Sequence, residues 1–233
     1  MRPGIDALAA LPLFAHFGTS QIDALNELAD LARVGPDEEL FREGDRLDEL
    51  HILLAGFVTE THAHHDGDAL TDVVAPVRPI GFASAMLGAA SPTGARTITS
   101  ARLIVIPAAE LRAMIREEPE LAMPFLDHAL ARMREQTLEL CQMKLRSSVQ
   151  RLAAFLLGLV EDPEMNPARF VLPYEKRFLA ARIGCTQENL SRAFAALRRL
   201  GVETQRGIVV LRDVPALRAF AGTPEPVRNT ASP

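Results

Sequence analysis

The most informative stretch of this chain is residues 174–211, YEKRFLAARIGCTQENLSRAFAALRRLGVETQRGIVVL. Phe178, Leu179 and Ile183 recur at the spacing of an apolar helical stripe. Gly184 follows as a flexible turn residue, and Thr186 fits the N-cap of a second helix. The pattern predicts a helix, a tight turn and a second helix.

The second helix has two distinct faces. Leu190, Phe194 and Leu197 form the face that we expect to be buried. The opposite face carries charged and polar residues: Gln187, Glu188, Ser191, Arg192, Arg198 and Arg199. A short helix with such groups near its N-terminal end has what reading a major groove requires.

A β-hairpin is predicted directly after this helix. Gly201 fits a helix stop, and Gly207 fits the turn between two short strands, residues 202–204 and 208–211. The combination is typical of a winged helix-turn-helix.

An ordinary helical hairpin packed in a core would show the same periodicity, so charge has to separate the two interpretations. Residues 142–212 contain 12 Lys/Arg and 6 Asp/Glu, a net charge of +6, whereas the whole chain is −5. A basic module on an acidic chain favours contact with a polyanion through that module.

The string TQENLSRAFAALRRLGV resembles the recognition helix of the CRP/FNR superfamily of bacterial regulators, with Glu188, Ser191 and Arg192 at the positions of its E-x-x-S-R signature. The preceding LPYEKRFLAARIG is similar to the FNR, FixK and DNR/NnrR branches. The resemblance covers nearly the whole chain, most specifically residues 145–211.

This resemblance implies an α+β fold in four parts. These are N-terminal helices with a cyclic-nucleotide-binding-like β-roll (a jelly roll) in 1–118, a dimerisation helix in 119–145, a winged helix-turn-helix in 146–221 and a tail in 222–233. Short predicted strands with turns between them fit the β-roll. We expect short helices over 5–33, strands over 73–77 and 98–106, and a hairpin turn at 66–68.

The resemblance also implies which residues contact DNA. Base readout of a TTGAT-type palindrome would fall to Gln187, Glu188, Ser191 and Arg192. The candidates for phosphate contact do not come from the resemblance, and ordinary solvated charge is the alternative for the cations among them: Lys176, Arg177, Thr186, Arg198, Arg199 and Arg206. Double-stranded DNA and RNA polymerase are the implied partners, and a role as activator in nitrogen-oxide or oxygen-linked respiration is the implied physiology.

The helix expected after Pro119 has a heptad pattern. Leu126, Met133 and Leu140 lie seven residues apart, with Leu130 and Thr137 offset by four. An amphipathic helix packed on its own domain would look alike. The resemblance favours a homodimer seam, and two recognition helices about 34 Å apart would read a palindrome.

A further set of candidate residues concerns a possible effector of the β-roll. Gly81, Phe82, Arg96 and Thr97 are candidates for its pocket, but Phe82 or Ala83 stands where cyclic-nucleotide-binding relatives carry a ribose-binding Glu, which argues against cyclic AMP. An iron–sulfur cluster is not expected, because Cys141 is the first cysteine. Haem is implied as an effector only by the resemblance to DNR-like regulators. The three histidines of THAHHD, residues 61–66, fit a solvated turn, with metal or haem binding as the alternative.

Other features limit the alternatives. Cys141 and Cys185 lack metal-ligand spacing, which fits a reducing cytoplasm. Cys185, just before the recognition helix and near Arg182 and Lys176, is a redox candidate with a favoured thiolate, or a small residue that fills the turn. No apolar stretch approaches about 18 residues, and neither a catalytic nor a metal-binding motif is present, so we expect neither an enzyme nor a membrane protein. An effector-independent regulator with a scaffold-only β-roll, and a cyclic-nucleotide or anion-binding module, remain as alternatives.

Overall fold

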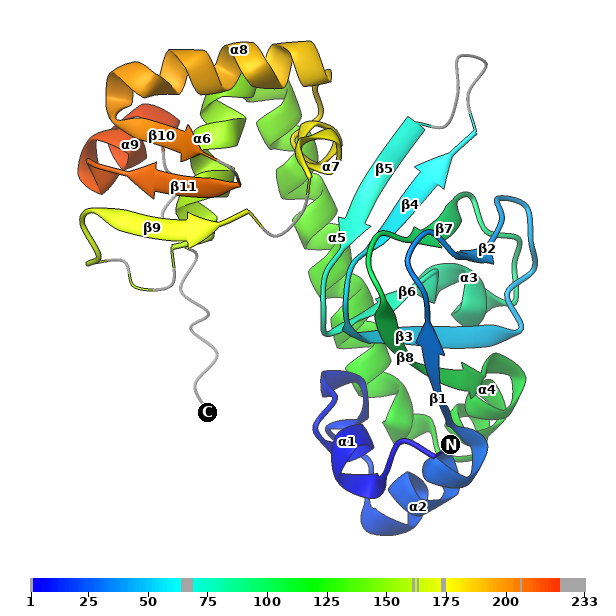
Figure 1. The fold of residues 1–233 in the computed structure, drawn as a ribbon. Helices are drawn as coiled ribbons and strands as arrows, with labels where there is room; N and C mark the ends of the chain where they lie inside the picture. The colour runs from blue at the N-terminus through cyan, green and yellow to red at the C-terminus, as the bar shows by residue number, and fades with distance from the viewer. Residues whose placement is uncertain are drawn as a thin grey trace. The chain divides into compact units, whose positions relative to one another are not determined.

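Two four-stranded antiparallel sheets form the first half of the protein (Figure 1). The structure is a computed structural model that describes residues 2–63, 69–160, 162, 164–172, 175–205 and 207–222. The sheet orders are β1-β8-β3-β6 and β2-β7-β4-β5. The strands are β1 Asp30–Val34, β2 Glu39–Phe41, β3 Glu49–Ala55, β4 Val58–His62, β5 Ala69–Val74, β6 Arg78–Ile80, β7 Gly94–Thr97 and β8 Ala101–Pro107.

The first core lies on these sheets. Ile52 of β3 pairs with Ile104 of β8, and both side chains are buried. Burying such branched side chains on a pleated surface favours strands over helices. The helices of this region are α1 Ile5–Ala9, the 3₁₀ helix η1 Pro12–Phe14, α2 Thr19–Leu28, α3 Phe82–Leu87, α4 Ala108–Glu117 and the 3₁₀ helix η2 Pro119–Leu121.

Some expected boundaries were wrong. The N-terminal helices end at Leu28 instead of reaching residue 33, because Asp30–Val34 pairs with β8 along its whole length. The strand expected over 73–77 is β5, which ends at Val74, and the run 98–106 yields β8 from Ala101. The expected hairpin turn at 66–68 lies outside the described residues, although His62 of β4 pairs with Ala69 of β5.

A long helix, α5 Ala122–Leu145, follows η2 as predicted, and the second core begins after it. The remaining elements are α6 Ser148–Gly158, β9 Ala168–Val171, α7 Lys176–Arg182, α8 Gln187–Leu197, the 3₁₀ helix η3 Arg198–Leu200, β10 Val202–Gln205, β11 Ile208–Leu211 and α9 Val214–Ala221. The predicted hairpin of β10 and β11 is present, and β9 adds an unpredicted third strand to it.

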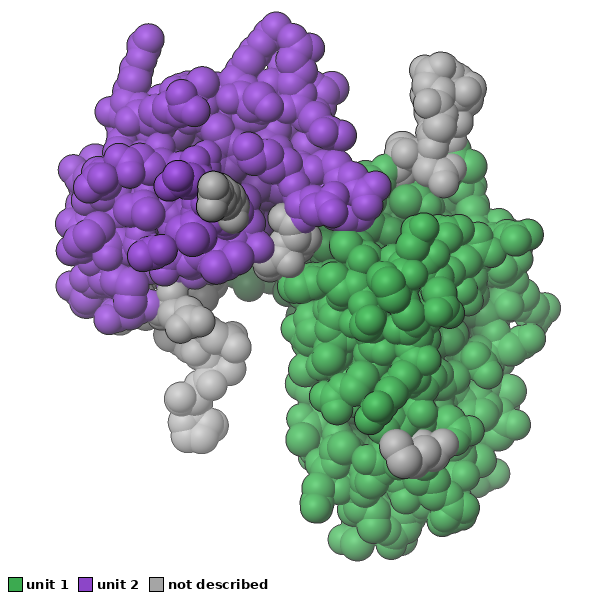
Figure 2. Space-filling model, viewed as in Figure 1, with its two compact units in different colours: residues 1–136 green, residues 137–233 purple. Residues whose placement is uncertain are grey.

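The chain divides into two compact units, residues 1–136 and 137–233, which Figure 2 colours green and purple. The division falls inside α5, so the last turns of that helix group with the helix-turn-helix. Each unit has its own buried core, on the two sheets in the first and around α6 and α8 in the second. The expected α+β architecture, with a β-roll, a long helix and a winged helix-turn-helix, is confirmed.

Candidate nucleic-acid interface

The turn between α7 and α8 has the predicted chemistry. Gly184 adopts a φ of +66°, a left-handed conformation that side-chain-bearing residues seldom adopt. The Thr186 hydroxyl accepts a hydrogen bond from the backbone N–H of Asn189 at 3.2 Å, which caps the first turn of α8. These two features fix where α8 begins.

α8 buries one face and exposes the other. Leu190, Ala193, Phe194 and Leu197 lie in the second core. Figure 1 shows α8 running beside α6, which this face covers. All four base-reading candidates are exposed: Gln187, Glu188, Ser191 and Arg192. The structure therefore gathers these candidates on the solvent face of one helix.

Glu188 and Arg192 form an ion pair across one helical turn. The Arg192 Nη2 to Glu188 Oε1 distance is 2.6 Å, and both side chains are 73% exposed. Such exposed pairs add little stability. The pair places a carboxylate acceptor and a forked guanidinium donor side by side on the solvent face of α8. The Ser191 hydroxyl donates to the Gln187 carbonyl at 3.0 Å.

The phosphate-contact candidates differ in their surroundings. Lys176 places its ammonium 5.4 Å from the centroid of the Phe194 ring. Arg177 stacks on Phe178 and pairs with Glu175 at 3.2 Å, so this carboxylate partly neutralises its charge. Arg198 is exposed at the end of α8. Arg206 lies outside the described residues.

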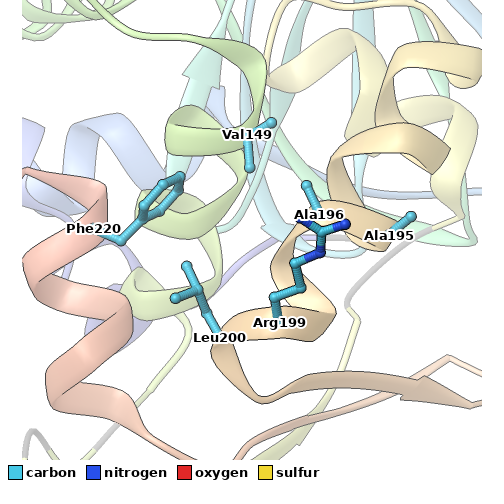
Figure 3. Close-up of a pocket in the computed structure, with 6 residues that line it drawn as sticks. All are labelled: Val149, Ala195, Ala196, Arg199, Leu200 and Phe220. Atoms are coloured by element: carbon cyan, nitrogen blue, oxygen red, sulfur yellow. The ribbon is translucent and has the colours of Figure 1, made fainter.

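Arg199 borders a shallow pocket of about 490 Å³. Figure 3 shows it beside apolar side chains of α6, α8, η3 and α9, namely Val149, Ala195, Ala196, Leu200 and Phe220. The aliphatic part of an arginine packs well on such a surface while its guanidinium stays in solvent.

Several cations of the basic module are paired within the protein. Arg182 lies 3.0 Å from Glu139, and Arg212 makes two hydrogen bonds to Glu203, at 2.6 and 3.0 Å. Glu203 is already counted in the net charge of +6, but Glu139 lies outside residues 142–212, so its pairing with Arg182 lowers the positive charge that this module offers to a polyanion. Sequence reasoning missed this pairing, since Glu139 and Arg182 are 43 positions apart.

The structure corrects the expectation for Cys185. Burial raises the pKa of its thiol, and the guanidinium of Arg151 opposes this only in part. Neither Arg182 nor Lys176 provides the expected stabilisation of a thiolate. Cys185 packs partly buried against the second core, which is the alternative role of a residue filling the turn.

The predicted dimer-seam residues of α5 are all exposed in the single chain. The exposed fractions are 49% for Leu126 and Leu130, 60% for Met133 and 52% for Leu140, and Thr137 is also exposed. Met123, Leu138 and Met143 add further exposed apolar surface to this helix. Large apolar side chains in such a row mark an interaction surface.

The four effector-pocket candidates each contact protein. Gly81 has a φ of +60°, and a Cβ there would lie 2.5 Å from Leu47 Cδ1. Phe82 stacks on Phe125 at 6.2 Å between ring centroids and packs edge-on against His128.

In the neighbouring sheet Arg96 pairs with Glu39 at 3.1 Å. The Thr97 hydroxyl donates to the Gly35 carbonyl at 2.7 Å. Arg96 thus already pairs with a carboxylate of the protein.

An unpredicted buried ionic cluster joins the β-roll to the first half of α5. Asp72 of β5 is 5% exposed and accepts from Arg78 of β6 and, at 2.6 Å, from Arg132 of α5. Glu60 of β4 accepts from the Gly81 N–H at 3.3 Å, and burial raises its pKa. Burial also lowers the pKa of His128, which favours its neutral form.

The comparisons with known proteins agree with this architecture. Residues 31–118 match the cyclic nucleotide-binding domain, and residues 150–220 match the Crp-like helix-turn-helix domain. Comparison with curated proteins gave no match. None of the helices among the described residues is long and apolar enough to cross a membrane.

Solved structures resemble nearly the whole chain. One, provisionally named a cAMP-binding regulatory protein, from Silicibacter pomeroyi DSS-3, is 26% identical, covering 94% of this chain and 100% of its own, with a TM-score of 0.66. FixK2 from Bradyrhizobium japonicum is 20% identical, covering 82% of this chain and 96% of its own, with a TM-score of 0.70. A CRP/FNR family transcriptional regulator from Thermus thermophilus is 22% identical, covering 83% of this chain and 99% of its own, with a TM-score of 0.66. With both domains matched in this order, the chain belongs to the CRP/FNR superfamily of DNA-binding transcription regulators.

Proposed function

We propose that the protein acts as a homodimer that recognises a TTGAT-type palindrome through the exposed face of α8. The observation that carries this proposal is the row of Glu188, Ser191 and Arg192 on the solvent side of a helix whose start is fixed by Thr186. An α-helix presented in this way fits the major groove.

Each side chain has a partner that suits its chemistry. Arg192 donates to O6 and N7 of a guanine, and Glu188 accepts from a cytosine amino group. Their 2.6 Å ion pair keeps both groups within reach of adjacent bases. Ser191 contacts a thymine, and Gln187 sets the outermost base preference.

Dimerisation supplies the palindromic spacing. Two copies of α5 facing each other would cover the exposed apolar row of Leu126, Leu130, Met133 and Leu140. A two-fold axis along this seam places two copies of α8 at equivalent half-sites, about 34 Å apart. We further propose that the protein contacts RNA polymerase, activates transcription and controls nitrogen-oxide or oxygen-linked respiration. These roles rest on the likeness to the FNR, FixK and DNR branches.

The packing around Phe82 favours a form of this function that needs no cyclic nucleotide. The Phe82 ring lies against Phe125 and His128, and Arg96 is paired with Glu39. The relative named for cAMP binding supports the other candidate, a regulator that responds to a cyclic nucleotide. Haem stays a proposed effector through the DNR-like branch, and absorption spectra with and without haem and nitric oxide would test it.

One titration tests the central proposal. A fluorescent duplex carrying TTGAT and its inverted copy is compared with a scrambled duplex at fixed salt, with and without cyclic AMP. We expect the palindrome to bind at least about 1,000-fold more tightly, as specific regulators do, with no change on adding cyclic AMP. Equal affinity for both duplexes would contradict the operator assignment. Tight binding only with cyclic AMP would contradict effector independence alone.

A further inference from the structure

The side chain of Arg151, on the first turns of α6, makes an unusual set of hydrogen bonds within the second compact unit. Its Nε donates to the Ile183 carbonyl at 2.7 Å, and its Nη2 donates to the Gly184 carbonyl at 3.0 Å. Its Nη1 donates to the Arg146 carbonyl at 2.6 Å, with a longer contact of 3.4 Å to Met143. One half-buried guanidinium thus serves two segments of the backbone.

Both segments are ends of helices. Ile183 and Gly184 follow α7, whereas Met143 lies in the last turn of α5 and Arg146 follows that helix directly. The last carbonyls of a helix have no partner within it, so the guanidinium satisfies acceptors that would otherwise need water. A planar fork can do this in several directions at once, which a lysine ammonium cannot reproduce.

Two further contacts join the same segments. The salt bridge between Arg182 of α7 and Glu139 of α5 measures 3.0 Å. The Met143 side chain covers Gly184, where a Cβ would lie 3.6 Å from Met143 Cε. Arg151 itself is held by α6, whose start is fixed by the reciprocal capping of Ser147 and Gln150.

We infer that Arg151 is a positioning residue for DNA recognition, which holds the turn before α8 against the last turns of α5. Its hydrogen bonds set where α7 ends, and Thr186 then starts α8 only three residues later. Any change in the end of α5 therefore reaches the recognition helix directly. The inference rests on the proposed function, but its structural half does not require DNA.

The test uses the full chain with two substitutions, Arg151→Lys and Arg151→Met, and Arg169→Met as the charge-matched control. Arg169 is exposed on β9 and lies in the same compact unit. Amide hydrogen exchange is followed in residues 183–190, in the hairpin of β10 and β11, and in α6. We expect both Arg151 variants to speed exchange about tenfold in residues 183–190 and little elsewhere, which Arg169→Met does not do.

Operator binding provides the second measurement. We expect both Arg151 variants to lose about tenfold in affinity for the palindrome and to keep the salt dependence of the wild type. A salt slope lower by about one in Arg151→Met would show a phosphate contact and overturn the inference. Unchanged exchange in residues 183–190 would overturn it too, as would equally faster exchange throughout the unit, which would mean general destabilisation. If exchange changes as expected but no duplex binds specifically even to the wild type, the proposed operator recognition is wrong. The positioning of the turn before α8 by Arg151 is then still supported.

Discussion

Arg192 and Glu188 are two of the single residues of α8 to which we assign base readout. We expect Arg192→Ala to lose about 1–3 kcal/mol of binding free energy per half-site and to relax discrimination at one guanine. The reason is the loss of a bidentate donor that reads O6 and N7. Selection from a library with a randomised half-site measures both effects.

Part of that loss comes from the partner carboxylate. Without Arg192, Glu188 loses an ion pair of 2.6 Å and faces DNA with an uncompensated charge. The double variant Glu188→Ala, Arg192→Ala separates the two contributions. A single Arg192→Ala variant with the same base preferences as wild type would remove Arg192 from base readout.

Glu60 gives a pH-dependent prediction. Burial raises its pKa, Asp72 adds to the increase, and the Gly81 N–H, Arg78 and Arg132 oppose it. Between the ordinary carboxyl pKa and the raised one, Glu60 is ionised in the unfolded chain but still protonated in the folded protein. The free energy of unfolding therefore falls as pH rises through this interval.

We accordingly expect Glu60→Gln to unfold at higher urea concentration than wild type at neutral pH. The amide keeps an oxygen acceptor for Gly81 and has no proton to lose. The difference should shrink as pH falls below the ordinary carboxyl pKa, where wild-type Glu60 is protonated in both states. A stabilisation that is constant with pH would show that ionisation of Glu60 is not its cause.

At the scale of elements, α5 carries the proposed dimer seam. Leu126→Asp or Met133→Asp would place two carboxylates opposite each other in a closed interface, at a cost of about 3 kcal/mol or more. Since both positions are exposed in the single chain, the monomer should still fold. Sedimentation should show a monomer with weakened operator binding.

Ala131→Asp provides the control, because Ala131 is exposed on α5 but lies outside the heptad positions. It should leave the dimer intact. A Met133→Asp variant that sediments as a folded dimer would locate the interface elsewhere on the protein.

The ends of α7 and α8 give a prediction on phosphate contacts. Neutralising Lys176, Arg198 or Arg199 should weaken binding to every sequence equally and lower the slope of log affinity against log salt by about one. Arg177→Gln should have a smaller effect, since Arg177 already pairs with Glu175. Binding titrations at several salt concentrations measure the slope, and four unchanged slopes would assign these cations no phosphate contact.

At the scale of the whole molecule, the boundary between the compact units falls within α5 and not at its end. The last turns of α5 carry Glu139 and Met143, and Arg146 follows directly after the helix; all three contact residues of α6 or of α7 and the turn after it. We expect a fragment of residues 137–222 to be about 1–3 kcal/mol more stable than one of residues 147–222, because the shorter fragment loses these partners.

Urea unfolding of both fragments would measure this difference, and Arg151→Met in each serves as the control. The substitution should cost more in the longer fragment, where the Arg146 carbonyl is present. Equal stability of the two wild-type fragments would show that α5 contributes nothing to the DNA-binding unit.

Features that depend on neighbours in the chain could be predicted from the sequence alone. The stripe of Leu190, Phe194 and Leu197, the Thr186 cap and the turn at Gly207 all follow from helical or strand periodicity and turn chemistry within a few residues. Resemblance in the same stretch supplied the family. The strand boundary at Asp30 was missed because its cause is a pairing with β8, some 70 positions away.

The pairing of charged side chains, by contrast, could not be predicted without the three-dimensional fold. Arg132 meets Asp72 across 60 positions, and Arg151 meets Ile183 across 32. The structure likewise showed that Cys185 is a partly buried thiol and that Arg96 is already paired. A local pattern specifies which face of a helix is apolar, but the environment of a charge depends on what the fold brings to it from distant parts of the chain.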